Sequence, residues 1–291
     1  MITTPQILEP LLSTPYCDHF EQPTYVLLQN GLNIELDLFR TVKALGKPNE
    51  PRIVNAGVYV FANMVQSNIV EHGPISRLDI GVYRPNDFTT MLNSPEEKDL
   101  LDGLKDLFFN SDINIFPEIQ RQKFAKNILN VVYASLACLT RFPLGSVYRP
   151  PPGPPGPAYE PYLESTTADR VNEFTRKWIE DIFRECIALG HAIGFPDSED
   201  GLPSDFATRS MASTEKNYAS PYVNHKPSTL LDLENGAPIE VEPIWGETVR
   251  MAREWKVEIP RIEMAYAFLV LIQNQIIRRI KSAKEVKENI T

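Results

Sequence analysis

Ser228-Thr-Leu-Leu-Asp232-Leu-Glu-Asn-Gly-Ala-Pro-Ile-Glu240-Val-Glu242 is the stretch that decides how the second half of this 291-residue chain folds. Ser228 and Glu240 are twelve residues apart, so on one straight helix they would lie ~18 Å from each other. Asn235-Gly236-Ala-Pro238 breaks such a helix, because glycine is common just past a helix end and proline cannot continue one. We therefore expect a short helix from Ser228, a break, and a chain that folds back. A polar helix cap followed by a surface turn is an alternative that the residues alone leave open.

The first 116 residues predict an α/β arrangement. The apolar run Tyr25–Gln29 is typical of a strand buried on both faces of a parallel sheet, Leu32–Leu45 has helical spacing, and Arg52–Val65 has a strand pattern. This order of strand, helix and strand is a βαβ unit. The next expected elements are two strands joined by a turn and a capped helix, at Ile69–Pro74, Arg77–Tyr83 and Ser94–Asn110. A short helix is expected at Pro5–Leu12.

After Pro117 the pattern is helical throughout. Five stretches have helical length and periodicity, with no strand pattern between them: Glu118–Arg141, Thr166–Gly194, Asp205–Tyr218, Pro243–Lys256 and Pro260–Ala283. Arg149-Pro-Pro-Pro-Gly-Pro-Pro-Gly-Pro157 lies between the first two and is interpreted as a stiff polyproline II connector or loop. The sequence therefore predicts an α/β half followed by an all-α half.

Composition indicates a globular protein of a reducing compartment. The 29 Lys and Arg against 38 Asp and Glu give a net charge of −9, which argues against nucleic acid or an anionic membrane as a partner. Cys17, Cys138 and Cys186 are odd in number and widely spaced, so they predict neither a disulfide framework nor a metal site. The most apolar run, Met264–Ile272, is nine residues long and too short to span a bilayer. We expect a cytoplasmic protein.

Two polar patterns are candidates for chemistry. Asn30 precedes Gly31 at the end of the first strand, where ligands bind in open α/β sheets, although Asn-Gly is also an ordinary turn. Lys126 and Asn130 are spaced i, i+4, which places both on one face of a helix. Lys123 and Asn127 have the same spacing, so the residues alone do not decide which of the two pairs is the candidate. They also leave open that both pairs are ordinary exposed polar residues.

With Phe124 included, this helix resembles the catalytic helix of the ketopantoate reductase family, in which an aromatic residue comes two before the Lys and an Asn four after it. Lys126 fits this order, because Lys123 would have Arg121 in place of the aromatic residue. The family often has a second Asn one turn further on, where this chain has Ala134. The resemblance covers roughly residues 24–280, is most specific in the last hundred, and is closest to fungal members.

The resemblance implies a truncated Rossmann-like domain at 1–116, a helical C-terminal domain at 117–291, and an NADPH-dependent reduction of 2-dehydropantoate or a related ketone. In that reaction Lys126 would be the catalytic general acid, Asn130, Ser228 and Glu240 would bind the substrate, and Asn30 would bind the cofactor. Asp232 matches a structural Asp of the family.

The cofactor fingerprint expected of such an enzyme is missing. None of the 14 glycines has another glycine two residues away, so no Gly-x-Gly turn is present to hold a pyrophosphate. In similar proteins this turn lies before the Asn-Gly strand, and the chain starts too late to contain it. Two interpretations follow: an active reductase of a small 2-oxo acid, or a truncated, catalytically impaired family member that binds NADPH poorly and acts as a binding or structural remnant. A homodimer could cover the sheet edge exposed by the missing strands.

Overall fold

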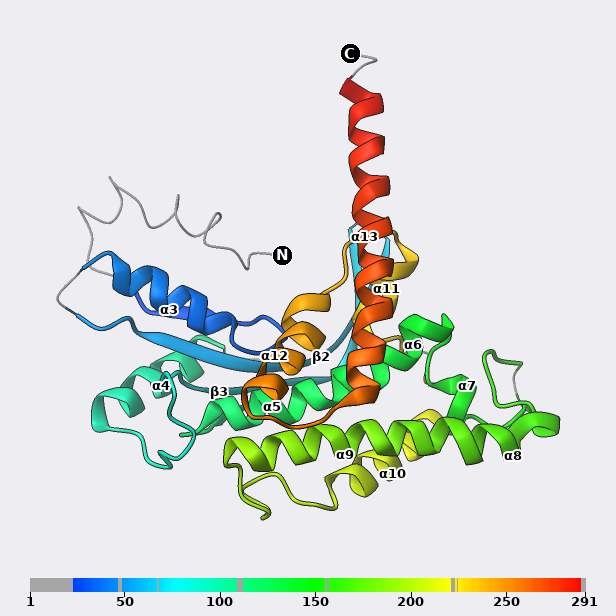
Figure 1. The fold of residues 1–291 in the computed structure, drawn as a ribbon, viewed down its shortest axis with the longest axis horizontal. Coiled ribbons are helices and arrows are strands. Elements are labelled where there is room, and N and C mark those ends of the chain that lie inside the picture. The colour runs from blue at the N-terminus through cyan, green and yellow to red at the C-terminus, as the bar shows by residue number, and fades with distance from the viewer. Residues whose placement is uncertain are drawn as a thin grey trace. The chain divides into compact units, whose positions relative to one another are not determined.

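The computed structural model describes residues 23–46, 49–66, 68–108, 112–154, 156, 158–220, 223 and 225–288 (Figure 1). The helix expected at Pro5–Leu12 and the residue Cys17 lie outside these ranges. The chain divides into two compact units, Met1–Asn127 and Ile128–Thr291. The boundary of the two domains expected at residues 116 and 117 stays a prediction.

The first unit contains a four-stranded mixed sheet in the order β1-β2-β3-β4. The strands are β1 (Tyr25–Leu27), β2 (Ile53–Gln66), β3 (Ile69–Val82) and β4 (Asp112–Ile115). β1 pairs parallel to β2, and α3 (Ile34–Ala44) connects them, so the predicted βαβ unit is confirmed. β4 pairs parallel to β3 after α4 (Pro95–Leu107), which makes a second unit of the same kind. The sequence pattern missed β4, a four-residue strand without a continuous apolar run.

β3 is one long strand, although Gly73-Pro74 predicted a turn between two shorter ones. It runs antiparallel to β2, and the pairing passes from Val60↔Ser76 to Ala62↔His72. β3 therefore has two more residues than β2 in this interval, which is a bulge. Proline lacks a backbone N–H and is tolerated in sheets at bulges, so Pro74 bends the ladder without ending the strand.

Both faces of the sheet are covered by helices (Figure 1). On one face α3 packs through Leu38 and Val42 against Ile53 and Tyr83. On the other face α4 contributes Leu101 to a core with alternate residues of the strands, namely Val54, Ala56, Leu78, Ile80 and Ile113. The alternation of side chains along a strand explains why successive residues of β2 belong to different cores.

The second unit, among the residues that the structure describes, is helical. The predicted helices are confirmed, and three of them contain short π-helical turns. The elements are α5 (Ile119–Leu129, which begins in the first unit), η1 (Asn130–Ala134), α6 (Ser135–Thr140), α7 (Gly145–Tyr148), η2 (Ser165–Thr167), α8 (Ala168–Arg170), η3 (Val171–Thr175), α9 (Arg176–Ile193), α10 (Phe206–Tyr218), α11 (Ser228–Glu234), η4 (Glu242–Gly246), α12 (Glu247–Glu254) and α13 (Pro260–Glu288).

Two of the π-helical turns, η1 and η4, meet through a buried tryptophan. Trp245 is fully buried, and its Nε1–H donates to the Ser135 hydroxyl at 2.7 Å and to the Val131 carbonyl at 3.3 Å. The Ser135 hydroxyl in turn donates to the Val131 carbonyl. Widened turns leave main-chain carbonyls without their usual partner, and these side-chain donors satisfy one of them.

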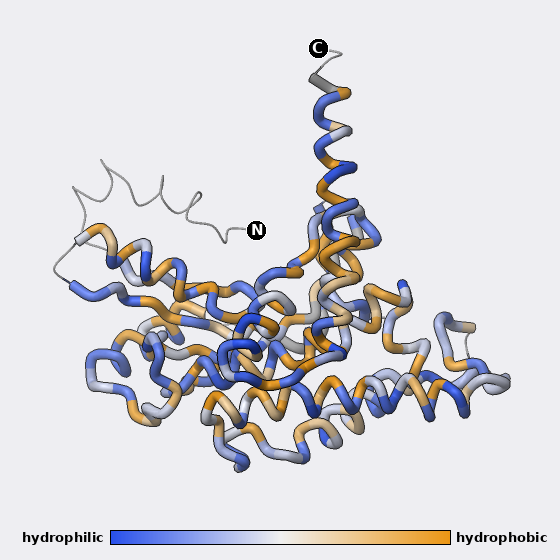
Figure 2. The backbone as a smooth tube through the Cα atoms, viewed as in Figure 1, coloured by the Kyte–Doolittle hydropathy of each residue, from blue (hydrophilic) through white to orange (hydrophobic). Residues whose placement is uncertain are grey.

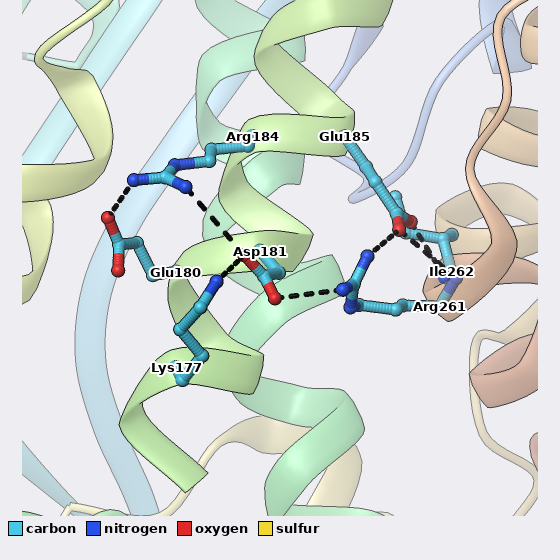
Figure 3. A network of polar contacts seen from close by, with 7 residues as sticks. All are labelled: Lys177, Glu180, Asp181, Arg184, Glu185, Arg261 and Ile262. Carbon is cyan, nitrogen blue, oxygen red and sulfur yellow. Dashed lines mark hydrogen bonds and ion pairs between the residues drawn. The ribbon is translucent and has the colours of Figure 1, made fainter. Parts of the chain in front are cut away.

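Hydrophobic and hydrophilic residues alternate along the long helix α9, and its buried residues have the spacing of one helix face (Figure 2). Its polar side begins a charged network with α13 (Figure 3). Glu185 of α9 accepts hydrogen bonds from the backbone N–H of Arg261 at 3.2 Å and of Ile262 at 3.1 Å. Arg261 also pairs with Asp181 at 2.9 Å. The start of α13 is therefore capped by a carboxylate from another helix.

None of the helices in the described ranges is long and apolar enough to cross a membrane.

Candidate active site

Asn30 and Lys126 meet in the first unit. Asn30 follows β1, and Gly31 behind it has φ +94°, a conformation that favours glycine and lets the chain turn into α3. Lys126 lies on α5, and its Nζ donates to Asn30 Oδ1 at 2.8 Å. Both side chains are partly exposed. An amide from the carboxyl end of a strand thus orients an ammonium group where open α/β sheets bind their ligands.

Lys123, the alternative in the same helix, has a different environment. Its Nζ lies 3.1 Å from Glu35 Oε2 of α3, and the two side chains are only 4% and 3% exposed. A buried ion pair of this kind is costly to break, so its ammonium group is committed to Glu35. This geometry favours Lys126 as the group that could meet a substrate.

Two residues that the sequence analysis did not select lie beside Lys126. Tyr59 and Arg77 are directly opposite each other in the β2–β3 ladder, and the Arg77 guanidinium carbon lies 4.0 Å from the centre of the Tyr59 ring. Lys126 Nζ lies 5.4 Å from the same centre. Burial raises the pKa of Tyr59, and the negative charge of Asp79 raises it further, so the hydroxyl stays protonated at neutral pH. Their separation by 18 residues in sequence concealed this pair, which only the strand register reveals.

Asp79 fixes Arg77 in this position. It is 2% exposed, and its Oδ1 lies 3.2 Å from Arg77 Nε. Asn114 of β4 donates to the same carboxylate at 3.1 Å. In the first unit, a series of contacts between polar side chains therefore leads from Asn114 of β4 through Asp79, Arg77 and Tyr59 to Lys126, which contacts Asn30 after β1.

Ser228 begins α11 in the second unit. Its side chain is exposed, and the backbone after it is helical up to Glu234. Gly236 follows with φ +67°, and the Ala237 N–H returns to the Asp232 carbonyl at 2.8 Å. This is the helix end with a left-handed glycine that the sequence predicted.

Glu240 lies on the segment that leaves this turn. Its neighbours Ile239 and Val241 are buried, and Ile239 N–H donates to Gln273 Oε1 of α13 at 2.9 Å. Burial raises the pKa of Asp232, and the negative charge of Glu240 raises it further. The two carboxylates thus interact, and Gln273, which the sequence analysis did not select, positions the segment between them.

Asn130 is partly exposed and is the first residue of η1, directly after α5. The i, i+4 argument assumed regular α-helix, whereas π-helical turns hold an additional residue and recur at functional sites. Ala134, where the family often has a second Asn, is buried in this turn. The convergence of Asn130, Ser228 and Glu240 with Lys126 stays a prediction.

The described residues fit a nicotinamide dinucleotide only in part. The expected role of Asn30 in cofactor binding stays a prediction. A pyrophosphate needs backbone N–H groups at a helix N-terminus without competing negative charge. The first turn of α3 carries Glu35 and Asp37, and the first turn of α4 carries Glu96 and Glu97. Both termini disfavour a phosphate, and no Gly-x-Gly occurs in the sequence.

The sequence of residues 162–273 matches the family model described as ketopantoate reductase PanE/ApbA C terminal. No curated protein matches the chain in sequence. Among solved structures, 2-dehydropantoate 2-reductase from Methylococcus capsulatus is similar, with a TM-score of 0.62 and 22% identity over 87% of this chain and 71% of that one. The dimeric ketopantoate reductase from Staphylococcus aureus has a TM-score of 0.59 and 18% identity over 94% and 76%. D-mandelate dehydrogenase with NADH and anilino(oxo)acetate has a TM-score of 0.62 and 15% identity over 88% and 69%.

A mixed α/β sheet followed by a helical half is the fold that this chain shares with these Rossmann-like reductases. Residues 162–273 of the helical half match the ketopantoate reductase C-terminal family model, and the chain shares the fold of the solved ketopantoate reductases to which it is similar.

Proposed function

We propose that this protein is an oxidoreductase that reduces the keto group of a small 2-oxo acid, 2-dehydropantoate or a related ketone of a fungal secondary pathway, with NADPH. The observation that carries the proposal is the 2.8 Å hydrogen bond from Lys126 to Asn30 at the end of β1. It is the arrangement that a proton donor next to a reacting ketone requires. The family of the helical half supports the same reaction.

Reduction of a ketone leaves negative charge on its oxygen, which must be stabilised and then protonated. In the proposal, the Lys126 ammonium hydrogen-bonds this oxygen and transfers a proton to it. Asn30 holds the ammonium in place and borders the cofactor, which supplies hydride when bound. Asn130 and Ser228 orient the substrate, and Glu240 accepts a hydrogen bond from a substrate hydroxyl or from Lys126.

Tyr59 and Arg77 extend this proposal. Arg77 lies 4.0 Å and Lys126 5.4 Å from the centre of the Tyr59 ring, so the two cations are at most about 9.4 Å apart. Arg77 is paired with Asp79, so in the proposal it acts as a second hydrogen-bond donor for an acidic substrate and not as an uncompensated charge.

The experiment is an NADPH titration of the purified chain, followed by the loss of absorbance with ketopantoate. Lys126→Met should lower turnover at least about 100-fold, as expected for loss of a general acid. Lys98→Met, at an exposed lysine of α4, is the matched control and should retain wild-type turnover. Turnover of Lys126→Met within tenfold of the wild type would refute the role of Lys126.

A second candidate function follows from the missing Gly-x-Gly turn and the acidic helix N-termini. In this version the chain is a catalytically impaired family member that binds NADPH poorly. Charge-assisted hydrogen bonds contribute about 1.5 to 3 kcal/mol each, so the loss of several would weaken cofactor binding by factors on the order of hundreds or more. Low-micromolar NADPH binding with steady turnover would exclude this version, whereas activity gained by an added N-terminal Gly-rich segment would support it.

We further propose a cytoplasmic homodimer. One similar structure is described as dimeric. On α13 three large apolar residues are exposed at the i, i+4, i+7 spacing of one helix face, namely Met264, Phe268 and Leu271. Sedimentation of the wild type and of Phe268→Glu tests this, because the variant should be monomeric at concentrations where the wild type is dimeric.

A further inference from the structure

A pocket of about 320 Å³ lies in the helical unit beside the proline-rich segment. It is formed by residues of α7 and its flanks, by the residues that follow the proline-rich segment, and by the end of α10 and the chain after it. Six of its lining residues are polar or aromatic and carry the argument: Arg149, Tyr159, Glu160, Tyr218, His225 and Lys226. We call it the Arg149 pocket.

Arg149 is the unusual member of this set. It is 1% exposed, although an arginine is rarely buried so completely unless its charge is paired. Its Nε donates to the Tyr218 carbonyl at 3.5 Å, its Nη1 to the Pro161 carbonyl at 3.4 Å, and its Nη2 to the Val223 carbonyl. These three acceptors are neutral, and a guanidinium has five N–H donors. The carbonyls orient Arg149 but do not neutralise it.

The charges around the pocket nearly balance, and Arg149 is its buried cation. Among the residues that the structure describes, Arg149 forms no ion pair with a carboxylate. The segments 149–161 and 218–226 contain one acidic residue, Glu160, which is exposed. Lys226 also lines the pocket and is held by Glu234 at 2.8 Å. Burial lowers the pKa of His225, which is therefore neutral at pH 7 and adds no charge.

The residues that follow the proline-rich segment, 158–161, build one wall of the pocket. The chain returns to Arg149 beyond them, where Leu163 N–H donates to the Arg149 carbonyl at 2.8 Å. The Tyr159 hydroxyl donates to the Pro150 carbonyl at 2.8 Å, and the centre of its ring lies 5.2 Å from the Arg149 guanidinium carbon. On the opposite side, a Cβ on Gly145 would lie 3.3 Å from that carbon, so glycine leaves room for the guanidinium.

We propose that the Arg149 pocket binds a small organic anion, whose carboxylate or phosphate group pairs with Arg149 and whose body lies against the ring of Tyr159. A planar guanidinium, fixed in advance and lacking a carboxylate partner, is suited to either group. The volume is that of a small ligand site. This binding site goes beyond the proposed reductase function, since it uses none of the residues Lys126, Asn130, Ser228 and Glu240.

Calorimetric titrations of the full chain with benzoate, inorganic phosphate and uncharged benzamide test the proposal. Benzoate or phosphate should bind with a dissociation constant of about 1 mM or tighter, and benzamide at least about tenfold more weakly. Binding of benzoate without phosphate identifies a carboxylate ligand, and the reverse identifies a phosphate. No binding of either anion at 10 mM, or equal binding of benzamide, overturns the proposal.

The key variant removes a negative charge from the exposed rim of the pocket. Glu160→Gln should bind the anion about two- to fivefold more tightly, because it abolishes a repulsion in a solvated setting. Glu258→Gln, at an exposed glutamate outside the lining residues, is the matched control and should bind as the wild type does. Equal binding by these two variants would show that the anion is not held in this pocket.

Arg149→Gln should weaken binding at least tenfold, provided that its circular dichroism spectrum matches the wild type. If it fails to fold, the comparison of Glu160→Gln with Glu258→Gln still decides the question. Lys126→Met should bind the anion as the wild type does. Loss of binding in that variant would assign the anion to the candidate active site and reject the Arg149 pocket.

Discussion

Glu185 connects α9 to the start of α13, and its replacement tests how much this connection stabilises the helical unit. In Glu185→Ala the N–H groups of Arg261 and Ile262 lose their acceptor. Loss of a helix cap costs about 1 to 2 kcal/mol, and loss of a partly buried carboxylate at a helix N-terminus up to about 1 kcal/mol more. Arg261 keeps its ion pair with Asp181 and so is not left unpaired. We expect the free energy of unfolding to fall by about 2 to 3 kcal/mol.

Urea unfolding followed by tryptophan fluorescence measures this loss. All three tryptophans, Trp178, Trp245 and Trp255, belong to the second unit, so the signal reports on that unit. Glu185→Gln keeps an acceptor oxygen and should lose only about 1 kcal/mol. Glu180→Ala, which removes an i, i+4 pair with Arg184 on the same helix, should lose less than about 0.5 kcal/mol. If Glu185→Ala and Glu180→Ala unfold at the same urea concentration, the capping argument is wrong.

Three further outcomes are expected. Ser135→Ala removes the 2.7 Å hydrogen bond to Trp245 and should lower the free energy of urea unfolding by about 1 kcal/mol; no change would mean that the Val131 carbonyl alone satisfies the indole. Gly81→Ala places a Cβ 2.2 Å from the Phe116 carbonyl oxygen and should lower the free energy of unfolding, measured by thermal denaturation, by about 3 kcal/mol. In the control Gly57→Ala the new Cβ would meet nothing closer than 3.5 Å, so the free energy should fall less. Equal losses in the two variants would contradict the close packing at Gly81. Hydrogen bonds from Thr90 and Thr89 lower the pKa of Asp87 to about 2, so its stabilising contribution is complete above about pH 4 and is lost as the pH falls toward 2. Asp87→Asn should therefore show a smaller fall in thermal midpoint than the wild type over that range.

The repeat of apolar residues along the sequence predicted the long strands and helices. Arg52–Val65 and the stretches after Pro117 are long enough for their apolar residues to repeat several times, and they form a strand and helices. Tyr25–Gln29 was recognised by its continuous apolar run and forms the three-residue strand β1. The four residues of β4 contain neither a long repeat nor a continuous apolar run. The antiparallel ladder of β2 and β3 overrode the local turn preference of Gly73-Pro74, since long-range pairing supplies hydrogen bonds that a local pattern does not contain.

The candidate site shows the same limit. Lys126 and Asn30 could be selected because each belongs to a short motif, and their expected roles stay predictions. Tyr59 and Arg77 are neighbours only through strand register, and the burial of Arg149 depends on three carbonyls from two distant segments. Contacts that depend on the register of strand pairing or on loop closure cannot be recognised from the spacing of residues along the sequence.

The π-helical turn Asn130–Ala134 has a consequence for how this chain tolerates changes of length. Such a turn holds one residue more than an α-helical turn, so deletion of a single residue there would restore a regular α-helix. A deletion within a regular α-helix rotates the residues that follow by about 100°, whereas the wider π-helical turn holds its additional residue within about one revolution. Deletion of one residue in Asn130–Ala134 should therefore leave Ser135 close to its present direction toward Trp245. The same deletion in the regular helix α9 has no widened turn to absorb it and would turn the buried face of that helix away from its core.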